Sequence, residues 1–446
     1  MDTYTIQLEI KSSITSKIKK INIAKGEVKT IKSLLDLGLR HEEQIKILKN
    51  LQDEIIALQS SQLATQLDGC IKCGGAMAKK GFNTSDFHSV FTDHKVKTQR
   101  QVCNGCGWRN IPSVKALFGT SSHPDLIKLQ CETGAEHTYR DAQIILNKQS
   151  LVKRKINNHE QIHHVIEKVG EYIGQTIEQN IIIPETKAKE LTVQIDGGHL
   201  KSKAPDTRSF EAMAGVIYRP ENILKAKNKR GKIISKHCAA SALSDNQEYM
   251  IKSVLVAAKK QGLSSTTNIT ALCDGADNCW NIANALQSHC ASLLGILDWF
   301  HVAMKFQNIS LPKTQKKRLE TVKWCLWHGN VDKAIDKINT LIEKVKNISR
   351  LAKLTKLKNY IVNNKDYIVD YDLRKNNNLA FTSNMAESTV ESLINQRCKG
   401  HQHMRWTRDG AHKLLQIRSY ITSNDWSDGW LDKIMGAMYK SSPLTI

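Results

Sequence analysis

The sequence has no long hydrophobic run: no segment approaches the roughly 18 continuous apolar residues that predict a membrane-spanning helix. Its N-terminus, MDTYTIQLEI, lacks the basic stretch, apolar run and small-residue cleavage site of a secretory signal. A P-loop of the form GxxxxGK(S/T) is also missing, so nothing implies ATP, and no repeat of roughly 20 to 50 residues is evident. We therefore expect a soluble protein of the cytoplasm, with no membrane partner and no nucleotide cofactor.

Positive charge is in excess. Lys plus Arg outnumber Asp plus Glu by 65 to 43, which gives a formal net charge of +22. Such an excess suits a polyanionic partner, because condensed counterions are released when basic side chains bind it. Charge alone fits DNA, RNA or an anionic membrane, and nucleic acid is the first candidate. The 446 residues are enough for roughly two to four domains.

Four of the 11 cysteines form two CxxC pairs. Cys70 and Cys73 lie in CIKCGG, and Cys103 and Cys106 lie in CNGCGW. The two-residue spacing lets both thiolates of a pair reach one ion from a tight turn, which the following glycine eases. Four cysteines make a closed tetrahedral site with no open position for catalysis. The pattern predicts a structural Zn²⁺.

The stretch between the two pairs alternates like a β-hairpin from Phe87 to Val102, which would bring the pairs together. We therefore predict a zinc ribbon over residues 66–118. His88 and His94 fall inside this stretch and are interpreted as exposed hairpin residues. We interpret the other cysteines as small residues of the apolar core.

The regions on either side of the ribbon have helical patterns. Residues 27–62 predict one or two amphipathic helices, for which ordinary packing is favoured over a dimerising coiled coil. Residues 119–175 contain three helix-like segments with Gly134 at the first turn, an order that resembles a helix-turn-helix and equally fits an ordinary bundle. In the DNA-binding interpretation the last segment, Val152 to Val169, is the recognition helix, and the residues at its start face DNA: Lys153, Arg154, Asn157 and Asn158.

From Leu191 onward the periodicity becomes that of an α/β domain. LTVQID alternates apolar and polar residues and predicts a half-buried strand that ends at Asp196. The expected order is βββαβαβ, with further elements around 210–218, 232–239, 246–260, 267–273, 278–286 and 293–297. Residues 300–380 are helical in pattern and rich in Lys, which predicts an all-α insertion.

Three acidic residues are candidate ligands for divalent metal ions. Phosphodiester cleavage by two metal ions requires carboxylates that converge from distant positions, since hard Mg²⁺ prefers oxygen ligands. Asp196 and Asp274 end adjacent predicted strands, and Glu387 opens the helix SNMAESTVESLINQR. Glu391 lies one turn after Glu387 on the same face and is an alternative ligand. The alternatives to Asp274 are Asp277 and Asp298.

With these acids, the sequence from about residue 65 to 425 resembles the DDE-type transposases of bacterial insertion sequences, relatives of the Mutator-like group. The matching features are the first Asp on the first strand, the second Asp after the fourth, a C/D-x-x-H motif and a helical insertion before the catalytic Glu. The C/D-x-x-H motif here is Asp298 to His301. After the Glu helix come an Arg and a Met-Arg-Trp patch, at Arg397, Met404, Arg405 and Trp406.

The resemblance implies an RNase H-like mixed sheet flanked by helices, and an enzyme that cuts and joins DNA strands. Asp196, Asp274 and Glu387 would hold two Mg²⁺ or Mn²⁺ ions. His301 would contact the phosphate or hold the fold. Trp406 and Arg405 would stack on a base or clamp a phosphate, or else pack under the last helix. The expected partner is double-stranded DNA, both the terminal repeats of the element and its target, bound by a homo-oligomer at the nucleoid.

The expected regions are a helical segment 1–65, the ribbon 66–118, the helix-turn-helix 119–175, the core 188–300, the insertion 301–380, and the last core part with C-terminal helices 381–446. Two other functions share these features. One is a DNA-binding regulator with a silent core, and the other is a metal-dependent nuclease or resolvase. The presence of all three acids favours the transposase over the regulator. Joining of a cut end to a target separates it from the nuclease.

Overall fold

The computed structural model describes residues 2–11, 18–60, 63, 67–150, 152–179, 181–224, 232–383, 391–400 and 404–439. The chain divides into two compact units, one formed by residues 1–166 with 429–446 and the other by residues 167–428. The sequence had grouped 429–446 with the core of the second unit. Among the described helices, none is long and apolar enough to cross a membrane.

The N-terminal segment begins with a β-hairpin. β1 (Thr3–Lys11) pairs antiparallel with β2 (Ile18–Glu27). The prediction that residues 1–65 are helical is therefore wrong for residues 3–11 and 18–27, because TYTIQLEIK alternates with the period of two that favours a strand. The predicted amphipathic helix is present as α1 (His41–Ser60), which starts after Gly38, a residue with φ of +73°.

The ribbon is a three-stranded antiparallel sheet. It consists of β3 (Met77–His88), β4 (Asp93–Cys103) and β5 (Arg109–Asn110), and the first two form the predicted hairpin. Along the first half of β4, exposed and buried residues alternate. Its Val96 packs with Ile56 of α1 and Val114 of α2 (Val114–Phe118) in a small apolar cluster. The predicted alternation of the hairpin therefore decides which face of the ribbon is buried.

Helices follow the ribbon, with boundaries that differ from the prediction. They are α3 (Pro124–Glu136), α4 (Tyr139–Asn147), a 3₁₀ turn (Lys155–Asn157) and α5 (His159–Gln175). Gly134 lies inside α3 instead of at a turn, and a Cβ there would come within 2.9 Å of Ile162 of α5. The third helix starts at His159, seven residues later than predicted, so the segment chosen as the start of a recognition helix precedes the helix.

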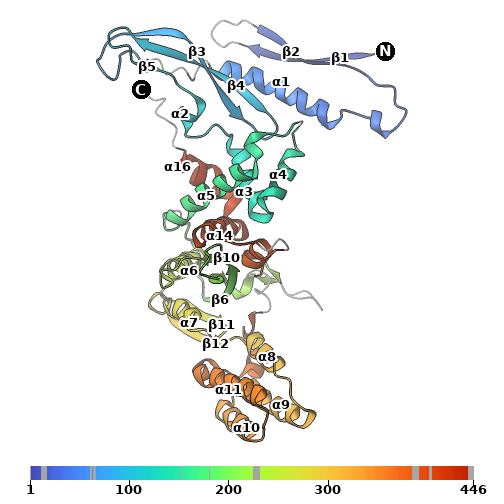
Figure 1. Ribbon diagram of the computed structural model, residues 1–446, viewed down its shortest axis with the longest axis vertical. Coiled ribbons are helices and arrows are strands. Elements are labelled where there is room, and N and C mark those ends of the chain that lie inside the picture. Colours follow the sequence, from blue (N-terminus) through green and yellow to red (C-terminus); the bar gives the residue numbers. More distant parts are fainter. Residues whose placement is uncertain are drawn as a thin grey trace. The chain divides into compact units, whose positions relative to one another are not determined.

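The second unit contains a mixed five-stranded sheet in the order β10-β7-β6-β11-β12 (Figure 1). β7 pairs antiparallel with both of its neighbours, β10 and β6. β11 pairs parallel with both of its neighbours, β6 and β12. The α/β order agrees with the sequence prediction, apart from a separate short hairpin of β8 and β9. The elements are β6 (Glu190–Lys201), β7 (Ser209–Tyr218), β8 (Ile223–Leu224), β9 (Lys232–Ile233), β10 (His237–Ser241), α6 (Glu248–Lys260), β11 (Asn268–Cys273), α7 (Asp277–Asn284) and β12 (Ser292–Leu297).

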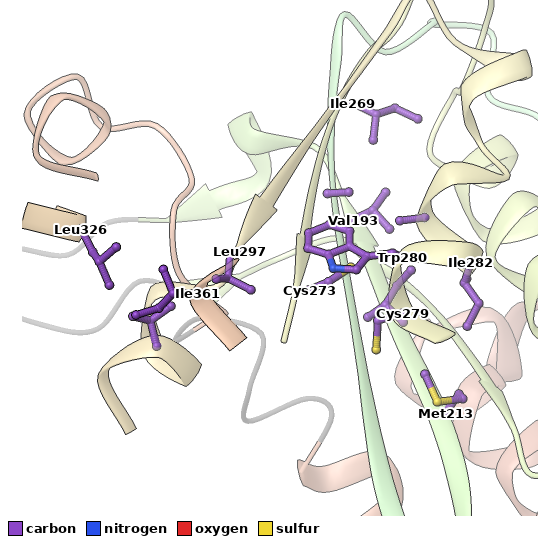
Figure 2. Packing of buried hydrophobic residues seen from close by; sticks show 14 of the residues in the cluster. Val193, Met213, Ile269, Cys273, Cys279, Trp280, Ile282, Leu297, Leu326 and Ile361 are labelled. Atoms are coloured by element: carbon purple, nitrogen blue, oxygen red, sulfur yellow. The ribbon is translucent and has the colours of Figure 1, made fainter. Parts of the chain in front are cut away.

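The core of the second unit is continuous from the sheet into the helical region (Figure 2). Val193 of β6 and Trp280 of α7 are among its buried residues. The Trp280 ring stacks on Tyr367 with centroids 3.7 Å apart, and its indole nitrogen donates to Asn364 at 3.0 Å. The central strand β6 is buried on both faces, and its buried Gln194 donates to the Tyr218 hydroxyl. Burial of β6 on both faces fixes its register in the sheet.

The region after β12 is helical, as predicted. It contains α8 (Trp299–Gln307), α9 (Lys313–Trp327), α10 (Val331–Glu343), α11 (Ile348–Asn363) and α12 (Tyr371–Asn376). Leu326 and Ile361 extend the apolar core into this insertion (Figure 2). A π-helix (Glu391–Gln396) and the helices α14 (Arg408–Thr422) and α15 (Asp425–Gly429) complete the unit, and the π-helix (Trp430–Met435) and α16 (Gly436–Met438) belong to the first unit.

Candidate metal centres and nucleic-acid contacts

The four predicted cysteine ligands converge in the ribbon. Their sulfur atoms all lie within 4.8 Å of one another. Cys70 is 3.6 Å from Cys106, and Cys73 is 3.5 Å from Cys103. Four sulfurs at zinc-bonding distance in a tetrahedron would be about 3.8 Å apart, so the cluster matches the size of a Zn²⁺ site.

Each pair of cysteines sits on a tight turn that also prepares the sulfur for a cation. Gly74 and Gly107 have φ of +71° and +72°, which favours glycine at both turns. The amides of Cys106 and Gly105 donate to the Cys103 sulfur and lower the pKa of this thiol to about 6. The pKa of Cys106 is instead raised to about 12, since a hydrogen bond from the Trp108 amide is outweighed by the sulfurs of Cys73 and Cys70. Four crowded thiols lose their protons together only beside a cation, which fits structural zinc.

The sheet of the second unit aligns three acids. Cys273 of β11 is paired with Ile195 of β6 and with Leu297 of β12. The next residue of each strand is an aspartate, so Asp196, Asp274 and Asp298 lie at one level across three parallel strands. Residues in register on parallel neighbours lie side by side. The acids therefore gather at one edge of the parallel half of the sheet.

Asp196 lies within β6, not at its end as predicted. β6 continues to Lys201 because it stays paired with β7, whereas its pairing with β11 stops at Ile195. The side chain is half-buried, and burial raises the pKa of its carboxyl group. Asp274 and Asp298 raise this pKa further, and the nearby His301 opposes them. A half-buried carboxylate beside two others is a position that a divalent cation would stabilise.

Asp298 holds His301. It is 1% exposed, caps α8 through the Phe300 amide and accepts from Nδ1 of His301 at 2.7 Å. The Ser383 amide and hydroxyl also donate to it. Burial would raise the pKa of Asp298, but the bonds from His301 and Ser383 outweigh it and hold the pKa low. Both oxygens of Asp298 are occupied, which disfavours it as an alternative to Asp274.

His301 lies among these acids. Burial would lower its pKa, but the hydrogen bond to Asp298 and the charges of Asp298, Asp196 and Asp274 outweigh burial and raise it. The acids around the imidazole therefore favour its charged form. Both interpretations of His301, as a contact to phosphate and as a structural group, are consistent with this position.

The loop after β11 is fixed by contacts of its backbone. The Asp274 carbonyl accepts from the Tyr360 hydroxyl at 2.8 Å, and its carboxylate accepts from the Ala276 amide at 2.9 Å. Gly275 has φ of +95°, and a Cβ there would lie 2.7 Å from the Tyr360 ring. The other alternative, Asp277, is exposed in the first turn of α7. These contacts favour Asp274 as the second acid.

The third predicted ligand, Glu387, lies outside the described residues, and the alternative Glu391 is exposed and hydrogen-bonded to Asn395. Gly197 and Gly198, which follow Asp196, are enclosed by other side chains of the unit. A Cβ on Gly197 would lie 2.6 Å from Glu211, and one on Gly198 would lie 3.3 Å from Ile394. The two glycines instead allow close packing within the chain, and the second brings the π-helix 391–396 against β6.

Two of the three predicted contacts near residue 400 are internal. Trp406 is 8% exposed, its indole donates to the Cys398 carbonyl at 3.1 Å, and its amide donates to Lys201. Arg397 is buried with its guanidinium 5.1 Å from the Trp406 ring centre. Of the two alternatives for Trp406, internal packing is the one present, and the expected DNA contact of Arg397 is wrong for the same reason, since both side chains are buried inside the unit. Arg405 is exposed and stays a candidate.

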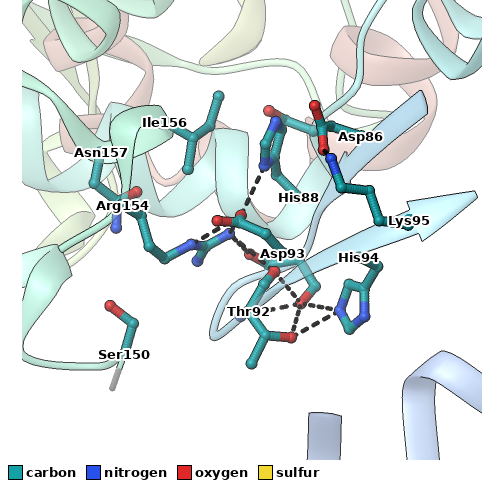
Figure 3. A network of polar contacts seen from close by, with 12 residues as sticks. Asp86, His88, Thr92, Asp93, His94, Lys95, Ser150, Arg154, Ile156 and Asn157 are labelled. Atoms are coloured by element: carbon teal, nitrogen blue, oxygen red, sulfur yellow. Dashed lines mark hydrogen bonds and ion pairs between the residues drawn. The ribbon is translucent and has the colours of Figure 1, made fainter. Parts of the chain in front are cut away.

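Arg154 is a structural residue of the first unit (Figure 3). It is 4% exposed and donates to the Asp93 carboxylate at 2.6 and 3.0 Å. Its Nη1 donates to the Val90 carbonyl, and Nη2 also donates to the carbonyls of Ser89 and Thr92. Burial raises the pKa of Asp93, but hydrogen bonds from His88 and Arg154 outweigh it and hold the pKa well below its usual range. The predicted DNA contact through Arg154 is wrong, because these contacts tie it to the β3–β4 turn.

Of the other residues of this segment that were predicted to contact DNA, some are buried or hydrogen-bonded within the chain and one remains available. Asn157 is fully buried and its amide donates to Asn147, so it does not face DNA. Asn158 is exposed but its side chain accepts from the Glu160 amide at the start of α5. Lys153 is exposed and remains available. His94, interpreted above as exposed, is buried against Asp53, with Nδ1 2.6 Å from the carboxylate.

No family model and no curated protein matches the chain. The structure gathers the four cysteines of the ribbon, and in the second unit it brings Asp196, Asp274, Asp298 and His301 together. Of the predicted basic contacts, Arg154 and Arg397 are buried, whereas Lys153 and Arg405 are exposed. Pairing of Arg154 with Asp93 had no local signal in the sequence, since the two residues are 61 positions apart.

Proposed function

We propose that the protein is a DDE-type DNA transposase with an RNase H-like core. The observation that carries the proposal is the alignment of Asp196 and Asp274 across adjacent parallel strands, with His301, whose pKa these acids raise, beside them. A sheet of three antiparallel strands followed by two parallel ones is also the order expected for an RNase H-like core. Such a site suits attack on a phosphodiester.

The proposal includes two Mg²⁺ or Mn²⁺ ions, which when bound would supply an activated water or 3′-hydroxyl and stabilise the leaving oxygen. Asp196 and Asp274 would hold these ions through their carboxylates. Asp298 positions His301 through the bond between Oδ2 and Nδ1. The imidazole would then donate to an oxygen of the phosphate.

Glu387 is proposed as the third carboxylate. The described residues on both sides of its segment are anchored near the acids. Before it, Ser383 donates to Asp298, and after it, Ile394 packs at Gly198, two residues beyond Asp196. Three carboxylates from β6, β11 and this segment would complete the donor set for two ions.

The first unit is proposed to bind the terminal DNA of the element, with the zinc ribbon as its scaffold. Lys153 is the residue of the predicted set that the fold leaves open, and the net charge of +22 supplies the general attraction. A homo-oligomer in the cytoplasm, assembled on DNA at the nucleoid, is part of the same proposal.

The test uses Asp196→Asn, Asp274→Asn and Glu387→Gln, which keep side-chain shape and remove charge. Each variant is expected to bind DNA as the wild type does and to show no nicking with Mg²⁺ or Mn²⁺, measured on a duplex with the DNA that flanks the gene. Glu391→Gln is the matched control and should cut. Normal cutting by all four variants contradicts the proposal. Cutting without joining of the 3′ end to a target indicates a nuclease instead, and binding without cutting by the wild type indicates a regulator.

A further inference from the structure

A pocket of about 270 Å³ lies in the helical insertion, between α8 and α11. The residues that line it come from the end of α8 and the residues just after it, and from one face of α11 at spacings of three and four. They are Lys305 of α8, Asn308 and Ile309 after it, and Lys353, Lys356, Leu357 and Tyr360 of α11. We call this the lysine pocket.

The charge of the lysine pocket is not balanced by the protein. Its three lysines are exposed, and no ion pair found among the described residues includes any of them. The ammonium group of Lys305 instead lies 4.2 Å from the centre of the Tyr360 ring. Three like charges around one hollow repel one another, so binding of an anion would be favourable. Ammonium and amide donors at its walls suit the oxygens of a phosphate.

Two contacts connect the lysine pocket to the acids. The Tyr360 hydroxyl donates to the Asp274 carbonyl at 2.8 Å. On α8, Lys305 lies four residues after His301, on the same face of the helix. His301 is bonded to Asp298. One face of α8 therefore presents His301 at the acids and, one helical turn later, Lys305 at the lysine pocket.

We propose that the lysine pocket binds a backbone phosphate of the DNA strand whose cleaved phosphate lies at Asp196 and Asp274. This proposal rests on the proposed function, because it takes the position of the cleaved phosphate from it. Leu357 and Ile309 form the apolar part of the lining and suit contact with a deoxyribose. Free inorganic phosphate has the same oxygens but lacks the sugar and the neighbouring charges.

The test is a lysine footprint on the full chain carrying Asp196→Asn. An acylating reagent at low extent modifies exposed lysines, and mass spectrometry gives the rate at each position with and without a 30-base-pair duplex. We expect DNA to slow the modification of Lys305, Lys353 and Lys356 at least threefold. Lys333 and Lys346 are exposed lysines of the same insertion that do not line the pocket, and they serve as internal controls with unchanged rates.

A pair of charge-matched double variants gives a second readout. Lys353→Gln with Lys356→Gln should reduce the slope of log affinity against log salt by about one to two, since each lost phosphate contact removes about 0.9. Lys333→Gln with Lys346→Gln has the same net charge and should leave the slope unchanged.

Equal rates at the pocket lysines with and without DNA would overturn the proposal, as would equal slopes for the two double variants. Equal protection by inorganic phosphate at the same phosphate concentration would also overturn it, in favour of a free-phosphate site. The footprint is read without metal and without cleavage. A protected pocket in a chain that never cuts DNA would therefore contradict the proposed function alone, and an unprotected pocket in a chain that cuts would contradict this inference alone.

Discussion

The ribbon and the sheet of the second unit are stabilised by different interactions. Beside the ribbon, three buried apolar side chains form a cluster, while four thiols and the Arg154–Asp93 pair fix its turns. The sheet instead belongs to a continuous apolar core that reaches into the insertion. A large core keeps a fold stable even when it holds charged groups that destabilise it, as Asp196 does. In the ribbon, clustered thiols able to bind a metal and an ion pair stabilise a small apolar core, whereas the fold of the second unit does not depend on its acids for stability.

The largest expected effect is loss of the ribbon without zinc. Structural zinc contributes on the order of 10 kcal/mol in small zinc-binding domains, so chelation or fourfold Cys→Ser at 70, 73, 103 and 106 should unfold residues 67–118. Hydrogen exchange should show fast exchange there and unchanged protection of β6 and β11. Cys290→Ser, outside the cluster, is the control. A zinc content near zero in folded protein would contradict the prediction.

A second effect separates two neighbours that the sequence treated alike. Arg154→Met should lower the free energy of unfolding of the first unit by about 2 to 4 kcal/mol. This loss is smaller than the roughly 3 to 5 kcal/mol that breaking a fully buried ion pair costs, because the Asp93 side chain is 43% exposed. Lys153→Met, one residue away and exposed, should change it by at most about 0.5 kcal/mol. Denaturant titration measures both, and equal effects would show that Arg154 is not a structural residue.

The third effect is a pH dependence of the second unit. Burial lowers the pKa of His412 to about 4 from its ordinary value of 6.5. Because the unfolded state binds a proton between pH 6.5 and 4 and the folded state does not, stability is full above pH 6.5 and falls by about 2 to 3 kcal/mol toward pH 4. His412→Gln should remove this part of the pH dependence, measured as the difference between the two unfolding curves. Parallel curves for wild type and variant would contradict it.

The smallest effect has the opposite sign. Asp196→Asn should raise the free energy of unfolding by about 0.5 to 1 kcal/mol at neutral pH in EDTA, because the folded state raises the pKa of this carboxyl group. Asp277→Asn is the matched control, since it is exposed in the first turn of α7 and should be neutral or slightly destabilising. If Asp196→Asn instead destabilises the unit, the comparison between a stabilising ribbon and a functional sheet is wrong.

Much of the architecture was predictable because its signals are local. The CxxC spacing determines a turn within a few residues, and the four sulfurs are found together. The period of two at LTVQID and the helical periods after residue 300 gave the order of elements. The first strand of the β1–β2 hairpin, TYTIQLEIK, has the same alternation of apolar and polar residues, but the prediction of a helical N-terminal segment overlooked it.

The sequence by itself determined the types of most elements from the ribbon onward and the four cysteines able to bind a metal, because these depend on spacing along the chain. Only the tertiary structure decided which basic and aromatic residues are available. Arg154 and Trp406 look like surface contacts in the sequence, but each finds its partner through chain packing, at Asp93 and beside Lys201. The register of β6, β11 and β12 also depends on the tertiary structure, because hydrogen bonds between strands far apart in the sequence determine it. This register places three aspartates at one level across the sheet.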